Sequence, residues 1–359
     1  VAQALKGLSP REDEIGPALA HALYADEKGA YTTPITGLET LARCPFRHFM
    51  ERGLHLAPAD EFGKTPIDEG NYYHAVLQHF LLLYRDRTLT REQCRSAVDK
   101  LCQAYEAREY LSGPYAQDAR ASLQAEKQRD SLYKAAWMLC RQKQGGQFVP
   151  QDTEVPCRIR VPLTNGAEGI ANGVIDRIDL KREGGTSYVR VVDYKSGSVS
   201  QADLTRFACG TSLQLPLYLQ MAAQKKQAAP SAMALSAVRA SVQEDDPQHA
   251  EEDLSEKKLK GYYTAHGVED RALSTQSAGR LLTDEQMAQV LSDSLAVTAS
   301  LFETLSQGHT APYPLKGAVD GCQYCAFANA CGYLSGVTPH RTVRKVSLSK
   351  EEDSHDPNA

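Results

Sequence analysis

The chain has 359 residues, of which 42% are hydrophobic and 24% charged, and its formal net charge is −5 at pH 7. This composition is ordinary for a globular protein, and the acidic balance excludes a basic coat that binds nucleic acid over its whole surface. No apolar run approaches the roughly 20 residues that a membrane-spanning helix needs, so we expect no membrane partner.

The cysteine count predicts a compartment, and the first residue predicts that the chain is part of a longer protein. Nine cysteines are an odd number, and they lack the density of a secreted disulfide framework. They therefore predict a reducing compartment, and we expect the cytoplasm. The chain begins at Val1 rather than at methionine, so we expect it to be a fragment of a longer protein.

The first part of the sequence is predicted to be mainly helical. Residues 1–34 are treated as an N-terminal extension of uncertain structure. Apolar residues at helical spacing then predict a series of helices. Their approximate ranges are 37–53, 66–86, 91–111 and 118–144.

The pattern changes to strands after residue 150. The segments "TEVPCRIRVPL", "GIANGVIDRIDLKR" and "SYVRVVDYKSG" are β-rich and separated by turn sequences, which predicts a meander of three antiparallel strands. A helix over 211–227 and a strand over 231–240 follow. Residues 243–258 are polar and acidic and predict an exposed loop. A long helix over 283–307 precedes a cysteine-rich segment and a frayed tail.

Acidic residues stand near the ends of two of these predicted strands. Asp176 lies in "GVIDRIDL", and Asp193 and Lys195 lie in "VVDYKSG". Residues i and i+2 of a strand point to the same side, so Asp193 and Lys195 share a face and Tyr194 is turned away. If the two strands pair, Asp176 lies beside Asp193.

Two carboxylates and a lysine at one place favour metal-assisted hydrolysis. Carboxylates suit Mg²⁺ or Mn²⁺, such a metal activates water and screens phosphate charge, and a lysine stabilises developing negative charge. A cross-strand ion pair on a solvated sheet face is the alternative, because acid-x-Lys triplets are common.

Three cysteines, Cys322, Cys325 and Cys331, lie within ten positions in "CQYCAFANAC". Tetrahedral zinc sites and iron–sulfur clusters both need four protein ligands. The spacing predicts a metal site whose fourth ligand comes from elsewhere, and it does not distinguish zinc from a cluster.

"GVIDRID", some fifteen residues, and then "VVDYKSG" resemble the core of the RecB-type PD-(D/E)xK nucleases. "QLPLYLQMA" is similar to the Gln-x-x-x-Tyr motif of that family, here Gln214 and Tyr218, which share a helix face. "EGNYYHAVLQHF" is similar to its Gly-x-x-x-His helix, here Gly70 and His74. The resemblance implies an α/β fold with a restriction-endonuclease-like core, in which helices flank a central mixed sheet.

The resemblance also implies roles for these residues. The metal would be held by His74, Asp176, Asp193 and the backbone carbonyl of Tyr194. The catalytic set would be Asp176, Asp193, Lys195, Gln214 and Tyr218. A glutamate often follows on the family's histidine helix, but this sequence has Gln78, so no metal contact is expected there. His79, about 100° round the helix from Gln78, is assigned to the core or surface.

One branch of the family carries an iron–sulfur cluster, with one cysteine before the nuclease core and three after it as C-x2-C-x5-C. The resemblance implies that Cys44, in "LARCPFRHFMERGL", is the fourth ligand of a [4Fe–4S] cluster. Such a staple would join the helical block to the C-terminal segment. Zinc on the same thiolates, or His309 or His340 as fourth ligand, is the alternative. The cysteines without ligand spacing are Cys94, Cys102, Cys140, Cys157 and Cys209.

In detail the sequence is similar to the nuclease domain of the AddB family, one of the two kinds of chain in the bacterial AddAB helicase–nucleases, over about residues 35–335. "ITGLETLARCPFRHFMERGLHL" and "KLKGYYTAHGVEDRAL" carry this likeness. It implies a metal-dependent DNA exonuclease that hydrolyses an unwound strand during the repair of double-strand breaks by recombination. The implied partners are a single-stranded DNA end and an AddA-type helicase–nuclease subunit. No G-x-x-x-x-G-K-[ST] motif is present, so any ATP dependence would come from elsewhere.

We therefore expect a nuclease domain over 35–335 and a flexible tail over 336–359. Within the domain the expected parts are a helical block (35–150), a catalytic core (151–240), an insertion (241–282) and a C-terminal helix with the cysteine segment (283–335). Two other functions stay open. One is a CRISPR-associated adaptation nuclease, which is usually much shorter, and the other is a non-catalytic DNA-binding module with a degenerate nuclease fold.

Overall fold

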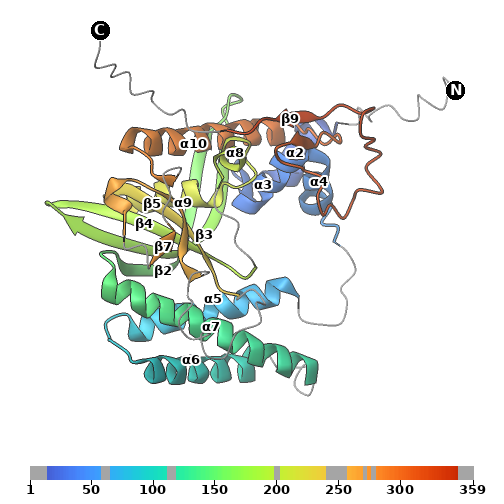
Figure 1. Ribbon diagram of the computed structural model, residues 1–359. Helices are drawn as coiled ribbons and strands as arrows, with labels where there is room; N and C mark the ends of the chain where they lie inside the picture. Colours follow the sequence, from blue (N-terminus) through green and yellow to red (C-terminus); the bar gives the residue numbers. More distant parts are fainter. Residues whose placement is uncertain are drawn as a thin grey trace, which may run out of the picture.

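The structure is a computed structural model, and it describes residues 14–57, 65–110, 119–197, 203–239, 257–269, 273–275 and 280–346. Among these residues a seven-stranded mixed sheet lies between two groups of helices (Figure 1). The strand order is β1-β3-β4-β5-β6-β7, with β2 paired to β3. This arrangement confirms the predicted α/β fold class with a central mixed sheet.

The strands that carry the site are β2 (Val149–Pro162), β3 (Glu168–Glu183) and β4 (Thr186–Lys195). They form the predicted antiparallel meander. The remaining strands of the sheet are β1 (Tyr31–Pro34), β5 (Ala229–Ala237), β6 (Leu259–Tyr263) and β7 (Ser274–Thr275). β4 and β5 are parallel, as are β1 and β3.

β3 changes its neighbour halfway along its length. Residues 169–172 pair with β1, whereas the pairing with β4 begins at Arg177. The segment "GVID" (173–176) lies between the two pairings. Ile175 and Ile178 belong to the same hydrophobic cluster although they are three positions apart, so the regular alternation of side chains is broken here. Asp176 therefore stands at an irregularity of the sheet that side chains from both faces can reach.

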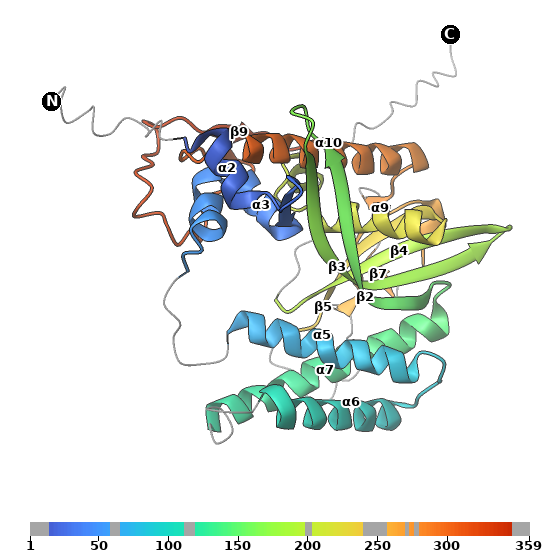
Figure 2. The same ribbon diagram turned by 180° about the vertical axis from the view of Figure 1, so that it is seen from behind.

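Two helical layers cover the two faces of the sheet (Figures 1 and 2). The α9 layer consists of α2 (Gly16–Tyr24), α3 (Ile35–Arg43), α4 (Pro45–His48), α8 (Leu204–Ala208), α9 (Gln214–Lys226) and α10 (Asp284–Ser306). The α5 layer consists of α5 (Pro66–Tyr84), α6 (Arg91–Tyr105) and α7 (Ala119–Gly145). Short π-helical turns follow α4 and α6, at Phe49–Gly53 and Glu106–Tyr110.

Alternating residues of β4 divide between two hydrophobic cores. Val189 and Val191 pack in the core of the α9 layer, and Val192 and Tyr194 pack in the core of the α5 layer. This is the period-two pattern of a strand that is buried on both faces. Asp193 and Lys195 then face the α9 layer.

The predicted helices occur close to their expected ranges because their ends carry strong start signals. Thr65, Thr90 and Thr283 each form a capping box with the residue three positions later. The predicted helix over 37–53 is interrupted, since Cys44 is extended (φ −166, ψ 124) and Pro45 begins a new helix.

Several short strands differ from the sequence-based expectation. β1 lies within the predicted extension 1–34, yet it pairs with β3. β6 was not expected. β9 (Arg341–Val343) lies within the predicted flexible tail, but it pairs in parallel with β8 (Leu315–Gly317). Strands this short carry too little side-chain pattern to be found without their partners.

Most of the predicted exposed loop, 243–258, lies outside the described residues, as does the tail beyond residue 346. None of the helices in the described ranges is long and apolar enough to cross a membrane.

Candidate active site

Three acidic residues form a row across β2, β3 and β4, which we call the carboxylate row: Glu154, Asp176 and Asp193. The pairs Thr153–Arg177 and Val155–Ile175 place Glu154 opposite Asp176. Because β3 and β4 are antiparallel and Arg177 pairs with Val192, the preceding residue Asp176 lies opposite Asp193. Strand register therefore gathers three carboxylates whose closest pair is 17 positions apart in the chain.

His74 approaches the row from the α5 layer. Its Nδ1 lies 3.2 Å from Glu154 Oε1 and 3.3 Å from Asp176 Oδ1. Burial alone would lower the pKa of His74, but the contacts with Asp176 and Glu154 outweigh it and raise this pKa to about 10. The imidazolium thus offsets part of the negative charge of the row.

His74, Glu154 and Asp176 offer ligand atoms that all lie within 4.8 Å of one another. Carboxylate oxygens and an imidazole nitrogen suit Mg²⁺ or Mn²⁺. The donor set therefore fits a hard divalent cation. Two of these three residues were predicted, and Glu154 was not.

Glu154 was missed although the sequence contains a signal for it. The β2–β3 hairpin closes through Leu163 N–H to Ala167 C=O, and counting back from this turn puts Glu154 opposite Asp176. Its left-handed backbone (φ 50) is unusual for a residue other than glycine and was not readable from the sequence. Strain of this kind is common in binding sites.

Lys195 stands on the other side of the row. Its Nζ lies 2.7 Å from Asp193 Oδ2 and donates to Gln214 Oε1 at 2.8 Å. Burial raises the pKa of Asp193 to about 6, with Lys195 opposing this rise and Asp176 adding to it. Burial alone would lower the pKa of Lys195, but Asp193 outweighs it and the pKa is raised. Lys195 is therefore a protonated side chain fixed in place beside the carboxylate row.

Tyr194 contributes its backbone to the site while its ring is turned away, as expected. Its N–H donates to Asp176 Oδ2 at 2.6 Å. The carbonyl of Lys195 accepts from Val238 N–H, on the β5 side of the strand. The N–H and C=O of one strand residue point to the same edge, so the Tyr194 carbonyl faces the side of Asp176.

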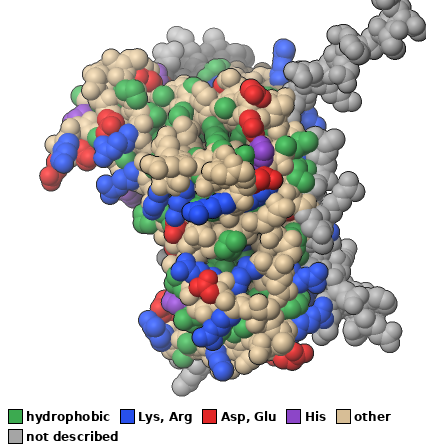
Figure 3. All heavy atoms as spheres, turned by 90° about the vertical axis from the view of Figure 1, so that its left-hand side faces the viewer, with side chains coloured by type: hydrophobic (Ala, Val, Ile, Leu, Met, Phe, Trp, Pro, Cys, Tyr) green, Lys and Arg blue, Asp and Glu red, His purple; other side chains and the backbone are tan. Residues whose placement is uncertain are grey.

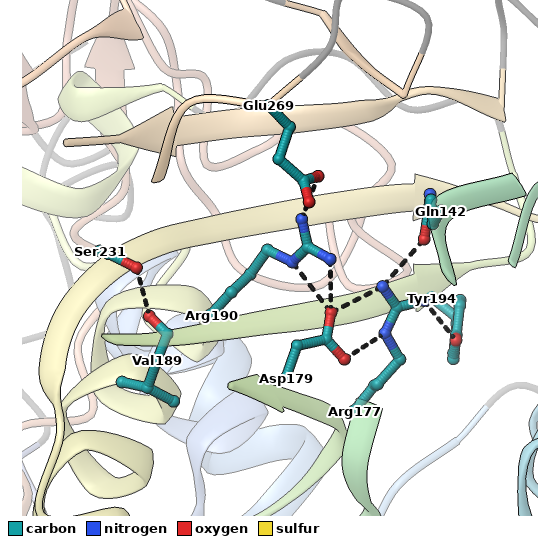
Figure 4. A network of polar contacts seen from close by, with 8 residues as sticks. All are labelled: Gln142, Arg177, Asp179, Val189, Arg190, Tyr194, Ser231 and Glu269. Atoms are coloured by element: carbon teal, nitrogen blue, oxygen red, sulfur yellow. Dashed lines mark hydrogen bonds and ion pairs between the residues drawn. The ribbon is translucent and has the colours of Figure 1, made fainter. Parts of the chain in front are cut away.

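A buried network of charges lies under the row, on the face of the α5 layer (Figure 4). Arg177 donates to both carboxylate oxygens of Asp179, at 2.8 and 2.7 Å, and to the Tyr194 hydroxyl at 3.2 Å. Arg190 also donates to Asp179, at 2.9 and 2.7 Å, and it pairs with Glu269. Two cations and two anions thus balance one another in the sheet and hold the strands that carry the row.

Gln214 and Tyr218, the predicted pair on α9, differ in role. Gln214 contacts Lys195, whereas Tyr218 is buried in the core and burial raises its pKa. A Cβ on Gly173 would lie 2.7 Å from the Tyr218 ring, so glycine in "GVID" lets this ring lie against β3. At Gly70, by contrast, a Cβ would meet nothing within 4 Å.

An open groove of about 330 Å³ is lined by the end of α5, by β2 residues 150–156, which include Glu154, and by Lys225 near the end of α9. Its cationic residues are Arg85 and Lys225. Arg85 is anchored through Nη1, which donates to the Gln151 carbonyl at 3.1 Å. Figure 3 shows Lys and Arg side chains in a row across one face of the molecule. The groove is also lined by Asp152 and Glu154, so its lining carries charges of both signs.

The four predicted cluster ligands, Cys44, Cys322, Cys325 and Cys331, are called the cysteine site below. A Cβ on Gly321 would lie 2.4 Å from the Arg43 carbonyl, so the segment before Cys322 lies directly against the one before Cys44. Burial raises the pKa of the Cys44 thiol, and N–H groups of Arg47, Tyr313 and Phe46 oppose this rise. The predicted joining of the two distant segments is present in the backbone.

The four thiols do not form a closed metal site as they stand. No three of these thiols lie within 4.8 Å of one another in the part of the chain that the structure describes. Thiolates about 2.3 Å from one tetrahedral zinc would be roughly 3.8 Å apart. His309, an alternative fourth ligand, instead contacts Glu14 and Gln307, and His340 is exposed. The soft sulfur donors suit an iron–sulfur cluster.

The comparisons with known proteins agree with this geometry. The sequence model of the PD-(D/E)XK nuclease superfamily matches residues 34–332. A subunit of an ATP-dependent helicase/deoxyribonuclease from Natranaerobius thermophilus is 26% identical over 94% of this chain and 32% of its own length. Proteins of the same name from Moorella thermoacetica and Desulfitobacterium hafniense are 33% and 30% identical over 60% and 62% of this chain, and 19% of their own length each. The chain thus spans a third or less of these curated relatives.

Proposed function

This chain belongs to the PD-(D/E)XK nuclease superfamily, and we propose that it is a metal-dependent deoxyribonuclease domain acting on a DNA strand unwound by a helicase–nuclease complex. The carboxylate row carries the proposal, because it is flanked by His74 at 3.2 Å from Glu154 and by Lys195 at 2.7 Å from Asp193. Metal ligands and a separate cation are the groups that phosphodiester hydrolysis needs.

The residues that would hold Mg²⁺ or Mn²⁺ are His74, Glu154, Asp176, Asp193 and the Tyr194 carbonyl. The bound cation would lower the pKa of a water molecule and offset charge on the scissile phosphate. His74 must lose its proton to become a ligand. Asp176 and Glu154 raise the pKa of His74 to about 10, so a cation that binds these carboxylates would compete with this proton.

Lys195 supplies a positive charge, which the carboxylates cannot provide. Its ammonium group is held by Asp193 and Gln214, and from there it can donate to the attacking water or to a phosphate oxygen. Such a donor, fixed before the reaction begins, stabilises negative charge that develops in the transition state.

The groove at Arg85 and Lys225 supports a single strand as the substrate. Cations of this kind contact phosphates without reading sequence, and Glu154 is among the residues that line the groove. A strand lying in it would pass directly beside the carboxylate row.

The cysteine site is proposed to hold a [4Fe–4S] cluster through Cys44, Cys322, Cys325 and Cys331. When bound, the cluster would bridge α3 and the C-terminal segment. The close approach of the segments before Cys44 and Cys322 supports a shared site, and the C-x2-C-x5-C spacing of the other three cysteines supports a cluster by its likeness to the family motif.

The proposed setting is recombinational repair with an AddA-type partner. The curated relatives are named as one subunit of an ATP-dependent helicase/deoxyribonuclease. Their name supports DNA as the substrate and a further protein chain as the partner.

A cleavage assay on end-labelled single-stranded DNA tests the proposal. We expect Mg²⁺-dependent cleavage that EDTA abolishes and that Lys195→Ala lowers by about 10³-fold. The melting temperature of this variant should stay close to that of the unmodified chain. Binding of DNA without cleavage would instead identify a non-catalytic module.

A further inference from the structure

Glu39, on α3, makes contacts that no other residue of the site provides. Its Oε1 accepts from the backbone N–H of Leu213 at 2.7 Å and from that of Gln214 at 3.3 Å. These are the first N–H groups of α9, where Leu213 is the N-cap residue and gives no side-chain cap. A helix end needs such acceptors, and Glu39 supplies one from a helix 174 positions earlier in the chain.

The contact made by Glu39 lies next to a residue of the proposed catalytic set. Gln214 is the first residue of α9, and its Oε1 holds Lys195 Nζ at 2.8 Å. The chain of contacts runs from Glu39 to the Gln214 backbone, and from the Gln214 side chain to Lys195. Moving the start of α9 therefore moves the group that holds Lys195.

α3 also contacts the other end of the loop that leads into α9, residues 211–214. Arg43 Nη2 donates to the Thr211 carbonyl at 3.3 Å, so Glu39 and Arg43 together grip residues 211–214. Cys44 follows Arg43 directly. One helix thus connects the cysteine site to the Gln214–Lys195 pair.

We propose that Glu39 is a positioning residue that sets the start of α9 so that Gln214 can hold Lys195. The inference rests on the proposed nuclease function. The hydrogen bonds of Glu39 go to the start of α9, and its charge also attracts the Lys195 ammonium group. Its loss should therefore change the rate of the chemical step and leave substrate and metal binding intact.

Two variants of the full chain separate position from simple stability. Glu39→Gln keeps an oxygen acceptor for the Leu213 N–H, and Glu39→Ala removes it. We expect kcat to fall about tenfold for Gln and about 10²-fold for Ala, because small displacements of reacting groups have effects of this size. KM for single-stranded DNA and affinity for Mn²⁺ should not change.

A double-mutant cycle with Gln214→Ala gives the decisive readout. Both residues act through Lys195, so the double variant should lose little more kcat than Gln214→Ala alone. A purely structural cap would instead give additive losses. Glu51→Ala is the control, because it removes a carboxylate of the same region whose ion-pair partner is Arg47.

Unchanged kcat in both Glu39 variants, or additive losses in the cycle, would overturn the inference while the nuclease function stands. No metal-dependent cleavage by the unmodified chain would overturn both. A fall in kcat with unchanged KM, partly restored by glutamine, supports the inference.

Discussion

The carboxylate row and the cysteine site both consist of side chains that we propose as metal ligands, but they depend on different lengths of chain. The row lies on three neighbouring strands within residues 154–193. The cysteine site joins Cys44 to a segment that begins 278 positions later (322 − 44). Strand register thus places the groups of the row before any metal binds, whereas the cysteine site brings together two distant ends. The first should serve chemistry and the second stability.

Two histidines show the same contrast in their protonation. His74 lies between carboxylates and its pKa is raised to about 10. His48, on α4 near the cysteine site, is buried, and burial together with Arg52 lowers its pKa to about 4. The surroundings of His74 favour its protonated form, and those of His48 favour its neutral form.

The largest expected effect separates the two regions. Asp193→Asn should lower cleavage by about 10³-fold, because it removes a proposed ligand and the ion-pair partner of Lys195. Burial disfavours the Asp193 carboxylate, so the melting temperature at pH 8 should be no lower than that of the unmodified chain. Cleavage assays and thermal denaturation check both parts, and a large loss of stability would remove the contrast.

Cys44→Ala should show the opposite pattern. We expect loss of iron and a fall in melting temperature of more than about 5 °C, because the staple between distant segments is broken. Iron and zinc analysis after anaerobic purification, with thermal denaturation, measures this. Cys209→Ala is the control, since Cys209 lies outside the ligand set. Stoichiometric zinc, or unchanged iron, would contradict the assignment.

His48 should make the cysteine region sensitive to acid. Its folded-state pKa lies below the ordinary value of 6.5, so its contribution to stability is complete above pH 6.5 and is lost as pH falls toward 4. The loss approaches about 3 kcal/mol. His48→Leu should abolish this part of the pH dependence, as measured by denaturant unfolding at several pH values. Equal slopes for both proteins would show that His48 is not buried as described.

Glu154→Gln tests whether the row extends to β2. The amide keeps the shape but loses a charge beside His74 and Asp176. We expect Mn²⁺ affinity about tenfold weaker, with cleavage partly recovered at high Mg²⁺. Calorimetric titration measures the affinity. An unchanged affinity would confine the site to β3, β4 and His74.

The smallest effect belongs to the groove. The double variant Arg85→Ala/Lys225→Ala should raise KM for single-stranded DNA about fivefold. The slope of the logarithm of the affinity against the logarithm of the salt concentration should fall by the equivalent of about two phosphate contacts. kcat should not change. Lys100→Ala, an exposed cation on α6, is the matched control. If this control has the same effect as the double variant, the groove is not the path of the strand.

The sequence predicted the features that depend on local pattern. The meander, the facing of Asp193 and Lys195, and the helix of His74 follow from periodicity, from turn sequences and from the family motifs. Glu154 could have been found by counting register from the hairpin turn. Its left-handed backbone could not, because glutamate carries no local signal for a positive φ.

Features that depend on distant packing were not predictable. Glu39 caps a helix that begins 175 positions later, and no local pattern marks that contact. β1 is four residues long and ends in proline, so only its pairing with β3 reveals it as a strand. These elements owe their structure to a partner that is remote in sequence.

Anomalous scattering from a crystal soaked in Mn²⁺ tests the central claim most directly. The account predicts a manganese peak between His74, Asp176 and Asp193, with Glu154 within reach and Lys195 on the opposite side of Asp193. Its ligands should lie roughly 2.0–2.2 Å from the peak. Occupied manganese elsewhere in the crystal, with none at the carboxylate row, would contradict the account.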